Sequence, residues 1–206
     1  MNKFPLINRT HYSLSQAFSK PEALVKACKT AGFDSVGLCD IGNVSGAVEF
    51  LDACKASKMR GIVGGEFGGF KVFAKNLDGW KELIGISTTW NCDERLNRES
   101  LTSPNLAVVE GDCGDCRYIE ASDETSYRIL RALVLKVKLK DLTEPTSGFH
   151  LPTADEIPEN SIFSVLTQVQ TYDITSPPKL PTFDCAGGTE IDYLWSLVEA
   201  GYSKMG

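Results

Sequence analysis

The stretch Ser35-Val-Gly-Leu-Cys-Asp-Ile-Gly-Asn43 decides the fold class, because a short apolar run ends there in an acidic residue and a turn. Short apolar runs bounded by turn signals are typical of buried strands. The pattern recurs where Gly61-Ile-Val-Gly64 is followed by Gly65 and Glu66. Between the two runs, apolar residues follow helical spacing at Ala47, Val48, Phe50, Leu51 and Cys54. A strand, an acidic residue, a loop and a helix thus follow one another and begin again, which predicts an α/β architecture.

Helices and strands are also predicted on both sides of this repeat. A first strand is expected at Phe4 to Ile7, and a helix follows the capping-box pattern of Ser19 and Glu22, with Pro21 at its start and Gly32 at its end. Further strands are expected at 70–74 and 105–109, further helices at 78–87 and 122–135, and a polar loop at 91–104.

The expected helix faces and caps follow from the same spacing rules. Trp80, Leu83 and Ile84 are predicted to point inward from one helix. In the next helix, which Ser122 is expected to cap, one face is predicted to hold Tyr127, Leu130 and Val134. Thr153 and Glu156 repeat the capping-box pattern, although Pro158 limits what can follow.

The last part of the chain has the composition of a linker and one helix. Residues 171–188 are rich in proline, at positions 177, 178 and 181, and in glycine, at positions 187 and 188. A final helix is predicted from Thr189 to Gly201, with Leu194, Leu197 and Val198 as its apolar stripe. We therefore divide the chain into a domain at 1–172 and a linker with a terminal helix at 173–206.

Charge and composition exclude several classes of protein. Of the 206 residues, 42% are hydrophobic and 23% charged, as in ordinary globular proteins, and the net charge is −6. DNA-binding modules need clustered basic residues, and the sequence has no such cluster, so we expect little direct DNA binding. No apolar run is long enough to cross a bilayer and no secretory signal precedes one, so we expect no membrane association and a cytoplasmic location.

The cysteines indicate a reducing compartment. There are seven, an odd number, and Cys28, Cys39 and Cys54 sit among apolar neighbours. Cys113 and Cys116 have a spacing that a metal or redox site could use, but zinc would need two further ligands. Neither His11 nor His150 stands at a matching spacing, so we expect no zinc site.

Two carboxylates lie at predicted strand ends, where α/β folds usually carry their functional groups. Asp40 and Glu66 both fall at predicted strand ends, and in parallel barrels the carboxyl ends of the strands carry the functional groups. The alternative is that both carboxylates are solvated or cap the next helix, and the spacing alone leaves both interpretations open.

Several blocks, in order along nearly the whole chain, resemble the N-terminal PHP (polymerase and histidinol phosphatase) domain of DNA polymerase III alpha subunits, members of the bacterial C-family of replicative polymerases. They are Tyr12-Ser-Leu14, Asp40-Ile-Gly-Asn43 with Gly46-Ala-Val-Glu-Phe50, Gly61-Ile-Val-Gly-Gly-Glu-Phe67, and Ala74-Lys-Asn-Leu-Asp-Gly-Trp80 with Leu83. Near the end, Pro181, Phe183, Tyr193-Leu194 and Glu199-Ala-Gly-Tyr202 resemble the linker and first helix that enter the polymerase palm.

This resemblance implies a distorted (β/α) barrel, here trimmed in the middle because residues 91–118 are shorter than their counterpart. It also implies a cleft of histidines and carboxylates that holds divalent metals around a water molecule. When the cleft positions of the resembled family are carried over to this sequence one at a time, they fall on Ile7, Arg9, Gln16, Ile41, Glu66, Asp115 and Arg117. Asp40 lies beside them.

These residues make a poor metal site. Ile7 and Ile41 cannot coordinate, and Arg9 and Arg117 place fixed positive charge where cations would sit. We therefore expect no catalytic residue, no metal and no cofactor in this segment. Glu66 and Asp115 can instead pair with Arg9 and Arg117. The alternative is that each arginine is a solvated surface residue, and the sequence leaves both interpretations open.

Three functional hypotheses follow from the resemblance. The first is a non-catalytic structural and interaction domain of a replicative DNA polymerase, in a bacterium or a phage host. Its implied partners are a palm and thumb, and a proofreading exonuclease or other replisome protein. The aspartates that bind the two catalytic magnesium ions are then expected after residue 206. The second hypothesis is a residual phosphoesterase or exonuclease that uses Asp40, Glu66 and Asp115. The third is a free-standing mimic from a phage or mobile element that binds a host replisome protein.

Overall fold

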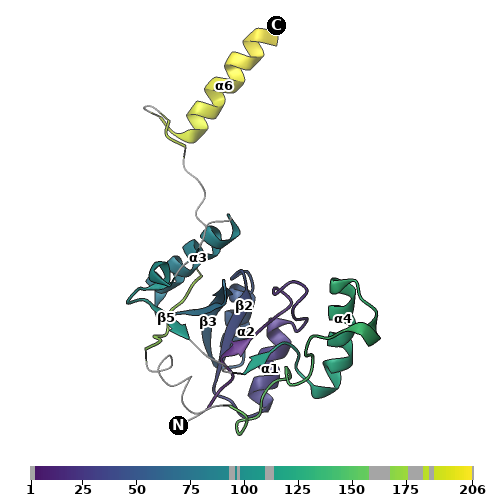
Figure 1. Ribbon diagram of the computed structural model, residues 1–206. Helices are drawn as coiled ribbons and strands as arrows, with labels where there is room; N and C mark the ends of the chain where they lie inside the picture. The colour runs from purple at the N-terminus through teal and green to yellow at the C-terminus, as the bar shows by residue number, and fades with distance from the viewer. Residues whose placement is uncertain are drawn as a thin grey trace. The chain divides into compact units, whose positions relative to one another are not determined.

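The computed structural model describes residues 3–92, 96, 98–109, 114–157, 168–175, 183–185 and 188–205. The chain forms two compact units, Met1–Ile174 and Thr175–Gly206 (Figure 1). The first unit holds the strands and most of the helices that the structure describes. Each unit is described by itself below.

The described strands of the first unit form two sheets, a small parallel sheet and a larger mixed one. In the smaller sheet, β1 (Ile7–Asn8) runs parallel to β6 (Asp115–Cys116). In the larger sheet, the order is β2 (Ser35–Ile41), β3 (Arg60–Phe67), β4 (Phe70–Ala74) and β5 (Leu106–Val109). β2 and β3 are parallel, whereas β4 is antiparallel to both β3 and β5.

The antiparallel pairing of β4 makes the larger sheet mixed, as a distorted barrel allows. The cause is the two-residue connection between β3 and β4, Gly68-Gly69. Both glycines have positive φ, at 59° and 86°, a conformation that favours glycine and forms tight hairpin turns. A parallel crossover needs a much longer connection, so β4 must fold back along β3.

Gly37 joins the two sheets. Its backbone N–H donates to the Pro5 carbonyl at 2.9 Å, and Asn8 Nδ2 donates to the Gly37 carbonyl at 2.7 Å. The approach is so close that a Cβ at position 37 would lie 2.1 Å from the Leu6 carbonyl oxygen. The chain before β1 therefore lies against β2, and β1 and β6 continue the line of strands.

Four helices accompany the strands in the described part of this unit. They are α1 (Pro21–Thr30), α2 (Ala47–Ala56), α3 (Leu77–Asn91) and α4 (Glu124–Leu135), with short 3-10 turns at 99–101, 121–123 and 139–141. α1 packs against α2, and α3 packs against β3 and β4. The core between helices and strands includes Leu24, Leu38, Phe50, Ile62 and Phe73, all fully buried. The architecture is mixed α/β, as predicted.

Two predicted N-caps fall on other residues. Lys20 is the N-cap of α1 and makes no side-chain cap. The predicted cap, Ser19, is buried, and its carbonyl accepts from the His11 N–H at 2.9 Å. Pro21 does occupy the first turn. Ser122 lies inside the 3-10 turn before α4, where Glu120 and Asp123 form the capping box. Thr153 was expected to cap a helix, but residues 154–156 form a turn. Within it, the Thr153 N–H donates to Glu156 Oε2 at 2.8 Å.

The buried helix faces also differ in part from the prediction. Ile84, Val48 and Val134 are 42%, 50% and 39% exposed, so none of them belongs to the core. α3 buries Leu83 and Ile86, and it continues through Asn91, which was expected in a loop. α4 buries Tyr127 as predicted, together with Arg131, whose guanidinium pairs with Glu144.

The second unit contains the helix α6 (Glu190–Met205). The helix begins one residue after the predicted start, and Thr189 caps it: its hydroxyl accepts from the Asp192 N–H at 3.2 Å and donates to Asp192 Oδ2 at 2.7 Å. Gly201, the predicted end, lies inside the helix, because a single glycine lowers helix stability without stopping the helix. Leu194, Leu197 and Val198 are exposed. The three prolines of the predicted linker lie outside the described residues. None of the helices in the described ranges is long and apolar enough to cross a bilayer.

Candidate functional site

The centre of the predicted cleft is a buried arginine. Arg9 directly follows β1 and is 2% exposed. Its Nη2 lies 2.5 Å from Glu66 Oε2 at the end of β3, and its Nε lies 2.8 Å from Asp115 Oδ1 on β6. Its Nη1 donates to the Cys39 carbonyl on β2. One side chain thus connects the ends of four neighbouring strands.

Arg117 completes the cluster from the other side of Asp115. Its Nη2 and Nε lie 2.9 and 3.0 Å from Asp115 Oδ2, so the two oxygens of Asp115 serve two different arginines. Arg117 Nη1 donates to the Tyr127 hydroxyl at 2.7 Å, and the guanidinium lies 4.4 Å from the centre of the Phe149 ring. Gln16 Oε1 accepts from the same Nη1 at 3.4 Å. Of the two interpretations left open, ion pairing is therefore confirmed for both arginines.

Charge balance keeps Arg9 protonated in this buried place. Burial alone would lower its pKa, but the acidic groups around it, Cys39, Asp115 and Glu66, raise the pKa above its ordinary value. Burial raises the pKa of the Cys39 thiol to about 12, so that group is neutral at pH 7. The two carboxylates therefore supply the negative charge that Arg9 balances.

Asp40 lies beside the cluster and is fully buried. Its Oδ1 accepts from the Thr10 N–H at 2.7 Å and the Ser13 hydroxyl at 2.6 Å, and its Oδ2 accepts from the Thr10 hydroxyl at 2.8 Å. Burial raises the pKa of this carboxyl, and these hydrogen bonds oppose the rise. Both oxygens hold the loop after β1 in place, which is a structural use of the carboxylate.

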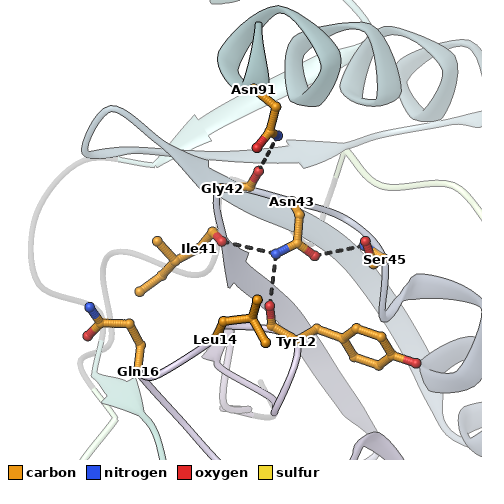
Figure 2. A pocket seen from close by; sticks show the side chains of 8 residues that line it. All are labelled: Tyr12, Leu14, Gln16, Ile41, Gly42, Asn43, Ser45 and Asn91. Atoms are coloured by element: carbon orange, nitrogen blue, oxygen red, sulfur yellow. Dashed lines mark hydrogen bonds between the residues drawn. The ribbon is translucent and has the colours of Figure 1, made fainter. Parts of the chain in front are cut away.

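The remaining cleft positions offer no charged ligand. Ile7 is buried in the core at 1% exposure. Ile41 and Gln16 line a hollow of about 490 Å³ together with Tyr12, Leu14, Gly42, Asn43, Ser45 and Asn91, all of them neutral (Figure 2). Asn43 Nδ2 donates to the carbonyls of Tyr12 at 2.9 Å and Ile41 at 3.1 Å, which fixes the wall of the hollow.

These residues do not fit a group of divalent cations. Glu66 and Asp115 point at a guanidinium that occupies the space between them, and a cation there would meet a fixed positive charge. In the part of the chain that the structure describes, no three His, Cys, Asp or Glu side chains gather to hold a metal. Cys116 is buried and its Sγ donates to the Tyr118 carbonyl at 3.3 Å, while Cys113 lies outside the described residues.

Sequence reasoning missed four groups that hold the cluster. Thr10 and Ser13 follow β1 and bind Asp40, whereas Tyr127 and Phe149 flank Arg117. Tyr127 was predicted as a core residue, but nothing in its helical spacing reveals a hydrogen bond by its hydroxyl. The one available signal was the presence of two hydroxyl residues, Thr10 and Ser13, in the loop after β1.

Comparisons with known proteins give a family for part of the first unit. A family model described as "PHP domain" matches residues 6–122. DNA polymerase III subunit alpha of Halalkalibacterium halodurans is 30% identical over 98 residues, which is 43% of this chain and 9% of that protein. The error-prone DNA polymerase of Mesorhizobium japonicum is 30% identical over 96 residues, 44% of this chain and 9% of that protein.

The chain therefore covers less than a tenth of the length of these curated relatives. Among solved structures, a candidate metal-dependent phosphoesterase from Bifidobacterium adolescentis gives a TM-score of 0.40 at 16% identity. That match covers 80% of this chain and 63% of the other.

Proposed function

The chain belongs to the PHP domain family, and we propose that it serves as a non-catalytic structural and interaction domain of a DNA polymerase III alpha-type replicative polymerase. The predicted family is confirmed by the family match over residues 6–122. The predicted fold, an α/β PHP-type barrel trimmed in the middle, agrees with that match and with the mixed strands of the first unit.

The observation that carries the proposal is the position of Arg9. A PHP cleft that works on phosphoesters needs cations around a water molecule, and here a buried guanidinium bridges the two carboxylates that remain. The ion pairs join β1, β3 and β6 by themselves. The domain then contributes its shape and surface to an assembly, and neither a metal nor another cofactor is needed for that role.

The two curated relatives support the replicative context. Both are named DNA polymerases, and each is matched over 9% of its length. We propose that a palm and thumb, in the same or a separate chain, are the principal partners, that a proofreading exonuclease or another replisome protein is a further partner, and that catalytic magnesium is bound by the palm. The assembly would work in the cytoplasm of a bacterium, with little direct DNA binding by this domain.

The geometry speaks against the residual phosphoesterase. That hypothesis requires Asp40, Glu66 and Asp115 to share a cation, yet Asp40 is fully buried and both of its oxygens are bound by Thr10 and Ser13. Glu66 and Asp115 are bound by Arg9. Opening such a site would break a buried ion pair, which costs several kcal/mol.

Two measurements test the proposal. Purified protein incubated with manganese or zinc and then dialysed is expected to hold less than about 0.1 metal per chain by elemental analysis and to leave single-stranded DNA intact. Stoichiometric metal with hydrolysis that is lost in Glu66→Ala would contradict it. The polymerase role is tested by affinity capture of the protein expressed together with its neighbouring genes. A chain that contains a palm should copurify with it, or the palm should be encoded in frame after residue 206. Capture of host replisome proteins in its place would favour the mimic.

A further inference from the structure

The helix α6 of the second unit, yellow in Figure 1, has a continuous apolar face. It is formed by residues at the three- and four-residue spacing that places side chains on one side of a helix: Ile191, Leu194, Trp195, Val198 and Tyr202. All five are exposed, from 49% at Val198 to 77% at Tyr202. An apolar face of this kind is typical of a contact with another molecule.

The opposite face of α6 is polar throughout. It carries Asp192, Ser196, Glu199 and Ser203, which follow one another at the same helical spacing. The apolar face is therefore confined to one side of the helix, and one elongated partner can cover it.

The edges of the apolar face carry a specific pattern. Along one edge, at seven-residue spacing, lie Glu190, Leu197 and Lys204. Along the other edge lie Trp195 and Tyr202. The first edge thus begins with a negative charge and ends about four helical turns later with a positive one. Charged edge residues of this kind set the partner and the orientation of paired helices.

The pattern is complementary to itself when two copies of α6 run antiparallel. With the level of Ser196 shared, Leu194 of each copy faces Val198 of the other. Ile191 then faces Gly201, which has no side chain to hinder it. Lys204 of each copy meets Glu190 of the other, so both ends of the pair gain an ion pair.

A parallel pair lacks this match. It would place both copies of Glu190 at one end and both copies of Lys204 at the other, and it would align the two helix dipoles. A lipid surface is also a poor partner, because α6 has three acidic residues and one lysine, whereas anionic lipids attract basic segments.

We propose that the apolar face of α6 is an interface between two copies of this chain, which pair their α6 helices in antiparallel orientation. The contact uses the same surface on both copies, so it closes at two chains. The helix is about 24 Å long. A pair of this length buries less than the roughly 1,600 Å² of a standard interface, so the dimer is weak and depends on concentration. The proposal concerns the second unit alone and does not depend on the scaffold role.

Sedimentation equilibrium of the purified chain tests the proposal. Between about 1 and 500 μM, the average mass should rise from one chain toward two and no further. Leu194→Glu places two carboxylates in the centre of the pair and should raise the dissociation constant about tenfold or more. Ser196→Glu is the matched control, since it adds the same charge to the polar face and should dimerise like the original chain.

A charge exchange tests the orientation. Lys204→Glu should raise the dissociation constant about fivefold, because each end of the pair then brings two carboxylates together. Combining it with Glu190→Lys restores opposite charges at both ends and should recover most of the loss. Circular dichroism of each variant checks that α6 remains helical.

A mass of one chain over the whole concentration range would overturn the proposal. So would a dimer that Leu194→Glu leaves unchanged, or that Ser196→Glu weakens equally. A double variant as weak as Lys204→Glu alone would overturn the antiparallel arrangement.

Discussion

Arg9 Nη2 and Glu66 Oε2 lie 2.5 Å apart at the ends of β1 and β3, and the arginine is 2% exposed. The pair spans 57 residues of sequence, so it exists only when the strands have assembled. Removing one partner of a buried ion pair leaves the other charge unpaired, which is far more destabilising than loss of a surface pair.

We therefore predict that Arg9→Met lowers the free energy of unfolding by about 3–5 kcal/mol, because Glu66 and Asp115 lose their counter-charge. Lys81→Met is the control, since its pair with Asp78 is 67% and 71% exposed and should change stability by at most about 0.5 kcal/mol. Urea unfolding followed by circular dichroism measures both. Equal changes in the two variants would show that the Arg9 cluster contributes no more than a surface pair.

The sequence placed Asp40 and Glu66 at strand ends, and the resemblance to the PHP domain added Arg9 and Asp115 to the same cleft. It could not decide between pairing and solvation, because the burial of Arg9 depends on β6, whose Asp115 lies 106 residues later. The direction of β4 was predictable in principle from Gly68-Gly69, a two-residue hairpin turn that the sequence analysis did not use. The hydrogen bonds of Asp40 with Thr10 and Ser13 had no sequence signal beyond proximity to a strand end.

Arg117 should be sensitive to the shape of its side chain as well as to its charge. Arg117→Lys keeps a positive charge near Asp115 but loses the two-pronged contact and the stacking on Phe149. We expect a loss of about 1–2 kcal/mol in the free energy of unfolding, less than for Arg9 because Arg117 is only half-buried. Thermal and urea unfolding check this prediction. A lysine variant as stable as the original chain would mean that only the positive charge at position 117 contributes to stability.

Close packing of the two sheets predicts opposite effects at two glycines. A Cβ at Gly37 would lie 2.1 Å from the Leu6 carbonyl oxygen, so Gly37→Ala must separate β1 from β2 and should cost about 3 kcal/mol or more. Gly85 lies in α3, where an added Cβ would meet no atom within 4 Å, so Gly85→Ala should stabilise by about 0.5–1 kcal/mol. The melting temperatures should shift in opposite directions. A shift of the same sign in both would contradict the close approach of β1 to β2.

Asp40 predicts a pH dependence of stability. Burial raises the pKa of this carboxyl above its usual value of 3.8 in the folded protein. At pH values between 3.8 and this raised pKa, the folded state binds more protons than the unfolded state. The free energy of unfolding therefore falls as the pH rises through that window. Asp40→Asn removes the titrating group. Its amide oxygen can still accept from the Thr10 N–H and the Ser13 hydroxyl, and the Thr10 hydroxyl can turn to accept from the new NH₂.

The stability of the original chain relative to Asp40→Asn should therefore decline as the pH is raised from below 3.8 through this window, and then stay constant. Urea unfolding of both proteins across the acidic range gives the difference directly, and shared effects of the other carboxyls cancel in it. A difference that rises with pH would mean that the hydrogen bonds from Thr10 and Ser13 outweigh burial and lower the pKa of Asp40. In that case the carboxylate would stabilise the loop after β1 most strongly in its charged form.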